Sequence, residues 1–180
     1  MYLKILFNFI LIVILAIFQI SLISSLPYYL NQINLALVVL IFILVLGDQK
    51  LALAWSIVLG FLFDVYFFLP FGFFLVCLPL TILAADFLLN NFFTNRSFYA
   101  FMALTFFSTF LYEFLRNTFV YIIDFFRINS TIFLFTKFFW VNFFIKITVN
   151  LALTFVFFYI VSFVSLKLKP VFLVKNKKLN

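Results

Sequence analysis

The long apolar segments of this chain limit its fold more than any other feature of the sequence. Of its 180 residues, 68% are hydrophobic and only 9% are charged, whereas a soluble domain carries about 25% charged residues. A helix that crosses a bilayer needs about 20 apolar residues. The sequence therefore predicts an all-α, polytopic membrane protein, a six-helix transmembrane bundle. A single transmembrane domain is expected over residues 1–166 and a basic cytoplasmic tail over residues 167–180.

The residue types that are missing exclude several classes of function. The chain has no His, and its one cysteine, Cys77, lies in an apolar run. His-based acid-base catalysis, His-containing triads and His- or thiolate-ligated metal sites are therefore excluded. The three glycines, Gly47, Gly60 and Gly72, form no phosphate-binding loop. We expect no enzyme activity, and no catalytic residue, cofactor or metal.

Prolines and polar turns separate the apolar segments. The first ends at Pro27, because the residue before a proline disfavours helix; a cleaved signal peptide is the alternative for this segment. The second has a clean apolar part only over residues 35–46, so a re-entrant segment is an alternative to a full span. The expected helices cover residues 5–23, 28–46, 51–69, 71–89, 98–123 and 142–166, with an interfacial segment at 132–141.

The cations predict the orientation of the chain. With six spans both termini lie on one side, and eight of the twelve Lys and Arg residues fall there: Lys4, Lys50, Arg96, Lys167, Lys169, Lys175, Lys177 and Lys178. The other side has Arg127 and Lys137, and Lys146 can extend toward it. Because cytoplasmic loops carry an excess of Lys and Arg, both termini are expected in the cytoplasm.

Four ionisable residues fall inside the expected spans, at similar depth toward the outer side. They are Asp64, Glu113, Arg116 and Lys146. Charges within a membrane are costly, so each marks a hypothesis for a functional site. Glu113 and Arg116 are three residues apart and share a helix face. Two acids and two bases favour an intramembrane polar cluster that neutralises itself and fixes helix packing; a substrate or ion site and a docking site for a partner protein are the alternatives.

The turn between the third and fourth helices carries a recognisable motif. It consists of Gly60-Phe61-Leu62-Phe63-Asp64 followed by Leu69-Pro70-Phe71-Gly72. This pattern, with the short chain and six spans, resembles the rod shape-determining protein MreD family. The match concerns Gly60, Asp64, Pro70 and Gly72. Here Gly60 would let a neighbouring backbone approach, Asp64 would supply a buried acceptor, Pro70 would end the helix and Gly72 would permit a sharp turn.

The resemblance implies a non-enzymatic integral membrane component of the bacterial elongation machinery, which scaffolds cell-wall synthesis proteins in the inner membrane. Besides membrane lipids, its implied partners are MreC, the actin-like MreB, RodA and a class B penicillin-binding protein; no nucleic acid is expected. The alternative is the substrate-binding S-component of an energy-coupling-factor vitamin transporter, whose fold MreD-like proteins are similar to. S-components pack their first helix on a coupling subunit through an Ala-x-x-x-Ala pattern, and the first helix here has only Ala16.

The two hypotheses differ in what they need between the helices. A vitamin-binding component must enclose a pocket of roughly 300 Å³ or more on its outer side, whereas a scaffold needs none. The chain contains 34 phenylalanines and few small residues. The sequence therefore favours a bundle whose interior is filled by large side chains, with no tight small-molecule ligand.

Overall fold

Helices make up all of the regular structure in the part of the chain that is described. The computed structural model describes the backbone of residues 2–23, 25–27, 30–67, 70–93, 97–126 and 137–172. The elements are α1 (Tyr2–Ile17), the π-helical segment η1 (Phe18–Ile23), α2 (Leu35–Leu46), α3 (Gln49–Tyr66), α4 (Phe73–Phe92), α5 (Phe98–Phe126) and α6 (Lys137–Phe172). Within these ranges, α1 with η1, α3, α4, α5 and α6 are long and apolar enough to cross a membrane. The protein is a multi-pass helical membrane protein.

The second apolar segment forms a shorter helix than the sequence predicted. α2 has 12 residues, or about 18 Å of helix, against a hydrocarbon core of about 30 Å. It packs against α3, α4, α5 and α6, and most of its side chains are buried. α2 is therefore a central helix that its neighbours shield from lipid, and by itself it is too short to count as a sixth full span.

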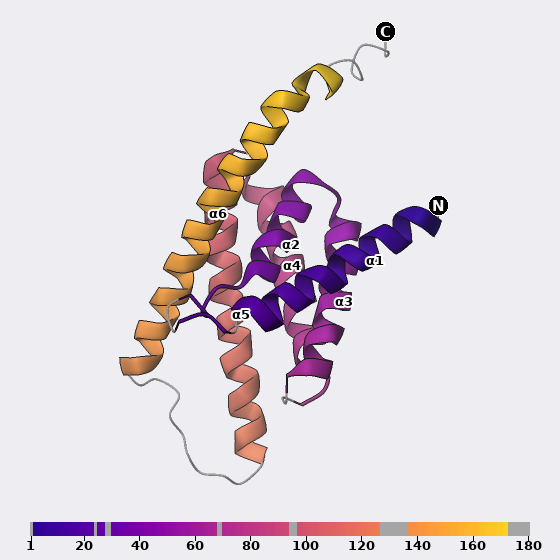
Figure 1. Cartoon of the computed structure of the whole chain (residues 1–180). Helices are drawn as coiled ribbons and strands as arrows, with labels where there is room; N and C mark the ends of the chain where they lie inside the picture. The colour runs from indigo at the N-terminus through magenta and orange to yellow at the C-terminus, as the bar shows by residue number, and fades with distance from the viewer. Residues whose placement is uncertain are drawn as a thin grey trace.

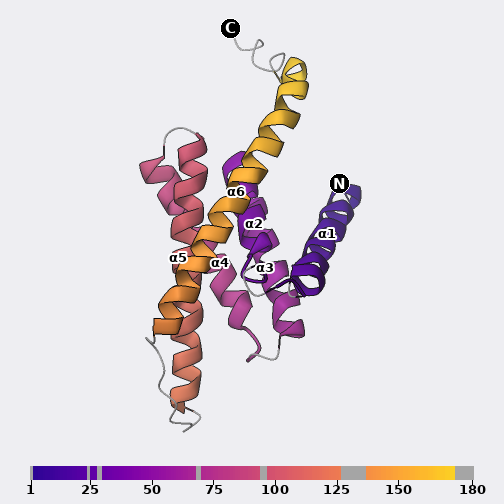
Figure 2. The same ribbon diagram turned by 60° about the vertical axis from the view of Figure 1, so that its left-hand side comes forward.

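Successive helices alternate in direction (Figures 1 and 2). At one end of the bundle, α1, α3 and α5 begin and α2, α4 and α6 finish. α3 ends and α4 begins at the opposite end. We call the first the terminal end and the second the hairpin end. The two ends of the described chain thus lie on the same side of the bundle, whichever side of the membrane that is.

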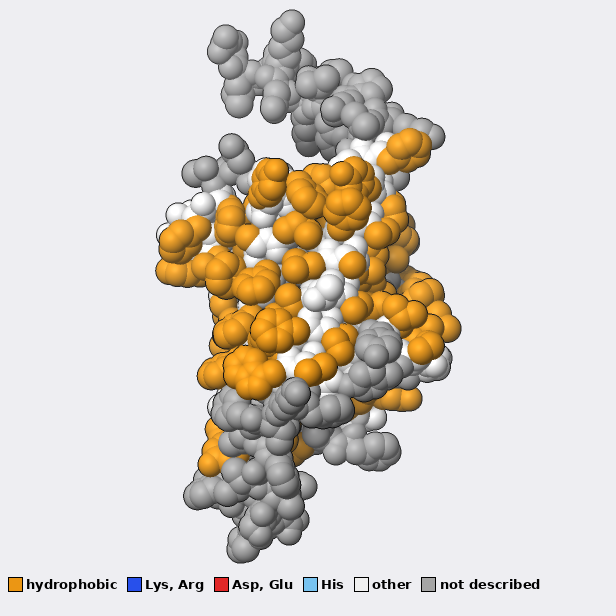
Figure 3. Space-filling view, turned by 90° about the vertical axis from the view of Figure 1, so that its left-hand side faces the viewer, with side chains coloured by type: hydrophobic (Ala, Val, Ile, Leu, Met, Phe, Trp, Pro, Cys, Tyr) orange, Lys and Arg blue, Asp and Glu red, His pale blue; other side chains and the backbone are white. Residues whose placement is uncertain are grey.

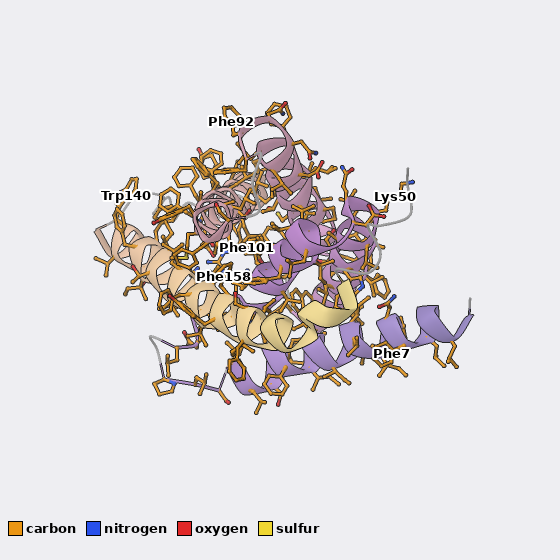
Figure 4. All side chains as sticks on the ribbon, turned by 90° about the horizontal axis from the view of Figure 1, so that it is seen from above. Phe7, Lys50, Phe92, Phe101, Trp140 and Phe158 are labelled. Atoms are coloured by element: carbon orange, nitrogen blue, oxygen red, sulfur yellow. The ribbon has the colours of Figure 1, made fainter. Side chains whose placement is uncertain are left out.

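Large apolar side chains fill the centre of the bundle. The ring of Phe42 on α2 lies 4.6 Å from that of Phe101 on α5, and Phe101 lies 5.5 Å from Phe158 on α6. Figure 4 shows Phe101 and Phe158 close together inside the bundle, whereas Phe7 lies at its periphery. In this central part, the interior is filled by large side chains as the sequence predicted.

The outer surface is apolar, as contact with lipid requires. Figure 3 shows one face, on which hydrophobic side chains cover most of the described surface. Along α1 the described side chains that are buried are Ile12 and Ala16. The other described side chains of this helix are exposed or partly exposed, and its large residues, Phe7 among them, face outward. α1 thus leaves much of its surface for lipid or a partner.

The last helix departs from the predicted boundaries at both ends. α6 covers Lys137–Phe172, so residues 137–141 continue the helix that was predicted to begin at residue 142. The helix also crosses the expected boundary between domain and tail at residue 166, because Lys and Leu are good helix formers and do not end it. Arg96, Arg127 and residues 173–180 lie outside the described residues, and so do residues 132–136 of the predicted interfacial segment.

Candidate functional site

A carboxylate at the hairpin end fastens α3 to the start of α4. Asp64 is only 5% exposed. Its two carboxylate oxygens accept three backbone N–H bonds, from Gly72 at 3.1 Å, Phe74 at 2.8 Å and Leu75 at 3.0 Å. The first N–H groups of a helix have no partner within the helix, and negative charge is favourable beside them. Inside a membrane such groups must be satisfied by the protein itself, and Asp64 does this for α4.

Gly60 lies one turn before Asp64 and faces the same part of α4. A Cβ at this position would lie 2.7 Å from the carbonyl oxygen of Phe74 and 2.8 Å from the Cα of Leu75. Real Cβ atoms do not approach backbone this closely, so the helices can pack at this distance only because residue 60 has no side chain. α3 and α4 accordingly form the most extensive helix pair of the bundle.

The turn itself depends on Pro70 and Gly72. Gly72 precedes the first residue of α4 and has a φ of 96°, in the left-handed region that favours glycine. The carbonyl of Pro70 accepts a hydrogen bond from the N–H of Phe73 at 3.3 Å. The four residues singled out by the sequence motif, Gly60, Asp64, Pro70 and Gly72, therefore all act on the beginning of α4. We call them the hairpin lock.

The intramembrane polar cluster is smaller than predicted. The Oε2 atom of Glu113 lies 2.8 Å from Nζ of Lys146 and 3.5 Å from Nη2 of Arg116. Within the described part of the chain, no Lys or Arg nitrogen lies at ion-pair distance from Asp64, because both of its oxygens are engaged at the start of α4. The predicted cluster of four is corrected to an ion-pair cluster of Glu113, Arg116 and Lys146.

The ion-pair cluster continues into a row of polar contacts between α5 and α6 that was not predicted from the sequence. Three pairs follow one another at intervals of one turn: Glu113 with Lys146, Thr109 with Asn150, and Thr105 with Thr154. The Asn150 amide donates to the Thr109 hydroxyl at 3.4 Å, and the last two hydroxyls are 3.0 Å apart. The signal was present as polar residues spaced by four on both segments, which antiparallel helices bring into register. We call this row the polar ladder.

The ladder also supports the start of α2 inside the bundle. The side-chain oxygen of Asn150 accepts from the N–H of Asn34 at 2.8 Å. The side-chain oxygen of Gln19, on η1, accepts from the N–H groups of Leu35 at 2.8 Å and Ala36 at 3.3 Å. These side chains satisfy backbone donors that would otherwise be unpaired in a low-dielectric environment. This is how a helix as short as α2 can begin in the interior.

A polar cavity of about 280 Å³ adjoins the ion-pair cluster. It is lined by Gln32, Glu113, Arg116, Asn117, Asn142, Phe143 and Lys146, and Asp64 is not among these residues. Large apolar side chains do not fill this space, because α2 begins only at Leu35 and the lining positions on α5 and α6, apart from Phe143, are polar. The volume is just below the roughly 300 Å³ at which pockets for small-molecule ligands begin.

Comparisons of the chain with family models, with curated proteins and with solved structures find no match. Among the described residues there is no group of three or more His, Cys, Asp or Glu side chains that could hold a metal ion. Cys77 is buried in the core, beside apolar neighbours. The candidate functional features of the described chain are the hairpin lock, the polar ladder and the polar cavity.

Proposed function

We propose that this protein is a non-enzymatic integral membrane component of the bacterial cell-shape machinery, which scaffolds the proteins of peptidoglycan synthesis. The observation that carries the proposal is the hairpin lock. The residues that resemble the MreD family belong to one packed unit, in which Gly60 permits close approach of α4 and Asp64 holds its first turn. A hairpin held in this way positions other helices and needs no reacting group.

The helix faces that a scaffold needs are present on the outside of the bundle. α1 is mostly exposed. Two apolar grooves flank α2, one of about 250 Å³ lined by residues of α1, α2 and α3, including Trp55, and one of about 370 Å³ lined by residues of α2, α3 and α6, including Phe157. Helices associate in membranes mainly through close packing. These faces are the proposed contacts for MreC, RodA and the class B penicillin-binding protein.

The proposed orientation places the terminal end in the cytoplasm of a cell with an inner membrane. Lys50 lies exposed at this end, at the start of α3, and the excess of Lys and Arg assigned to this side favours a cytoplasmic location. The actin-like MreB would then be reached from the terminal end. The hairpin lock and the polar cavity would both lie in the outer half of the membrane.

A second candidate is the S-component of an energy-coupling-factor transporter, and the polar cavity favours it. A cavity with charged walls toward the outer end is where such a component would take up its substrate. The first helix argues against it, because Ala16 is only 3% exposed and belongs to the core of this chain. It is therefore not available as part of a small-residue face for a coupling subunit.

Affinity capture in a mild detergent separates the two candidates. The full chain carries a tag and is expressed in the source bacterium, with an unrelated multi-pass protein bearing the same tag as the control. The proposal predicts enrichment of MreC and RodA over the control. Enrichment of a coupling subunit with its ATPases, without those two proteins, would replace it with the transporter function.

A further inference from the structure

The polar cavity carries one more positive charge than its own carboxylate neutralises. Its charged walls are Arg116, Lys146 and Glu113, and both cations contact the same carboxylate oxygen, Oε2. The remaining polar walls, Gln32, Asn117 and Asn142, are neutral amides. The net charge among the described lining residues is therefore positive.

In their contacts with the described residues, the two cations leave hydrogen-bond donors unused. Arginine has five N–H donors in a planar fork, and the described contact of Arg116 with Glu113, at 3.5 Å, is too long to be a strong hydrogen bond. Lys146 has three donors and uses one on Glu113 at 2.8 Å. The Arg116 side chain is 39% exposed, so it can turn toward a ligand in the cavity without leaving the cluster.

The depth of the cavity makes an unneutralised charge costly. Glu113 lies about 22 Å along α5 from Phe98, at 1.5 Å per residue, which places the ion-pair cluster within the membrane thickness, in the half toward the hairpin end. A charge at this depth is expensive unless it is paired with a counter-charge. An anion seated between Arg116 and Lys146 would supply the missing counter-charge.

We propose that this cavity binds a phosphate group. The guanidinium fork and the ammonium group are the two side chains that recognise phosphate oxygens, the first through paired hydrogen bonds and the second as a point charge. Donors come from α5, from α6 and from the segment before α2, which suits a tetrahedral group better than a planar carboxylate. The phosphate belongs either to a lipid head group or to a free anion, and the cavity of about 280 Å³ has room for it. This inference goes beyond the scaffold function and does not depend on it.

The test uses two probes that carry the same chemical group. The full chain is purified in a phosphate-free maltoside detergent and titrated with inorganic phosphate in one arm and with a soluble short-chain phosphatidylglycerol in the other. Sodium chloride at matched ionic strength is the reference. The readout is the midpoint of thermal unfolding, because a ligand that binds only the folded state raises it in a saturable way. The key variant is Arg116→Gln, and Lys50→Gln, which removes an exposed cation at the terminal end, is the matched control.

The midpoint of thermal unfolding should rise in the same saturable way for the wild-type protein and for Lys50→Gln. Arg116→Gln should bind the phosphate probe at least tenfold more weakly, because it removes a charge-assisted hydrogen bond. Arg116→Lys, which keeps the charge, should restore part of the affinity. A response to the lipid alone assigns the head group as the source, and a response to inorganic phosphate assigns the free anion. The proposal is overturned if neither probe raises the midpoint above the chloride reference, or if Arg116→Gln and Lys50→Gln weaken binding equally.

Discussion

Gly60 and Asp64 lie one turn apart on α3, and both contact the residues with which α4 begins. Gly60 sets the distance between the helices, because a Cβ there would lie 2.7 Å from the Phe74 carbonyl oxygen. Asp64 uses that distance to reach three backbone N–H groups at 2.8 to 3.1 Å. Packing and capping are therefore coupled: a wider helix spacing would also stretch the bonds of Asp64.

A methyl group at position 60 should force α3 and α4 apart. The atoms that a Cβ would meet are backbone atoms of Phe74 and Leu75, which cannot turn aside as a flexible side chain can. Gly60→Ala should therefore lower the free energy of unfolding by about 1–3 kcal/mol, as overpacking does in other interiors. Denaturant unfolding in detergent measures this. Ala54→Val, which adds methyl groups on an exposed position of the same helix, should change it much less; equal losses in the two variants would refute the close-approach role of Gly60.

The carboxylate of Asp64 should contribute more to the stability of the fold than that of Asp48. Both cap a helix, but Asp48 is exposed and accepts one bond, from the N–H of Lys50 at 3.3 Å. Asparagine is as good a cap as aspartate at an exposed helix start, whereas at position 64 it offers one acceptor oxygen for three backbone donors. Asp64→Asn should cost about 2–3 kcal/mol, the value of charge-assisted bonds lost in a buried setting, and Asp48→Asn almost nothing. Equal thermal midpoints for the two variants would contradict the account of Asp64.

The polar ladder predicts coupling between α5 and α6. A double-mutant cycle of Thr105→Val and Thr154→Val should give an interaction energy of about 0.6 kcal/mol, the average for hydrogen bonds between membrane helices. The matched cycle uses Thr118 and Thr148, which are exposed and bond to carbonyl oxygens of their own helices, and it should give none. If the interaction energy of the Thr105–Thr154 cycle is no larger than that of the matched cycle, the two hydroxyls do not stabilise each other.

The two ends of the bundle should face opposite sides of the membrane. A fluorescent protein fused after Asn180 should fluoresce, because it folds only in the cytoplasm, and alkaline phosphatase fused there should be inactive. The same reporters inserted at Phe71, in the turn of the hairpin, should give the opposite pattern. Active phosphatase after Asn180 would mean that the orientation drawn from the Lys and Arg residues is wrong.

The lengths of the apolar segments, and the prolines and polar turns between them, were enough to predict most of the helices. Segments near 5–23, 51–69, 71–89 and 98–123 were predicted from uninterrupted hydrophobic runs between prolines and polar turns, and the structure has helices there within a few residues. The motif of Gly60, Asp64, Pro70 and Gly72 could also be found, because its residue types have special backbone or charge requirements. These signals are local and can therefore be read along the chain.

Features that depend on neighbours in space could not be read in this way. Asp64 was expected beside Arg116 and Lys146, but its partners are backbone N–H groups, which have no signature in the sequence. The length of α2 depends on shielding by four other helices, and its start depends on Gln19 and Asn150 from distant segments. The cavity likewise depends on polar residues of α5 and α6 that lie close to the segment before α2.

Complementation tests whether the hairpin lock serves the maintenance of cell shape. The source bacterium is depleted of its own copy and supplied with the wild-type protein, with Asp48→Asn or with Asp64→Asn, each at a membrane level checked by immunoblot. Length and width of the cells are then measured by microscopy. We expect the wild-type protein and Asp48→Asn to restore rods, and Asp64→Asn to leave rounded cells. Rods restored by Asp64→Asn at a wild-type membrane level would contradict the role of the hairpin lock, and cells that keep their rod shape after depletion, with no copy supplied, would contradict the cell-shape function.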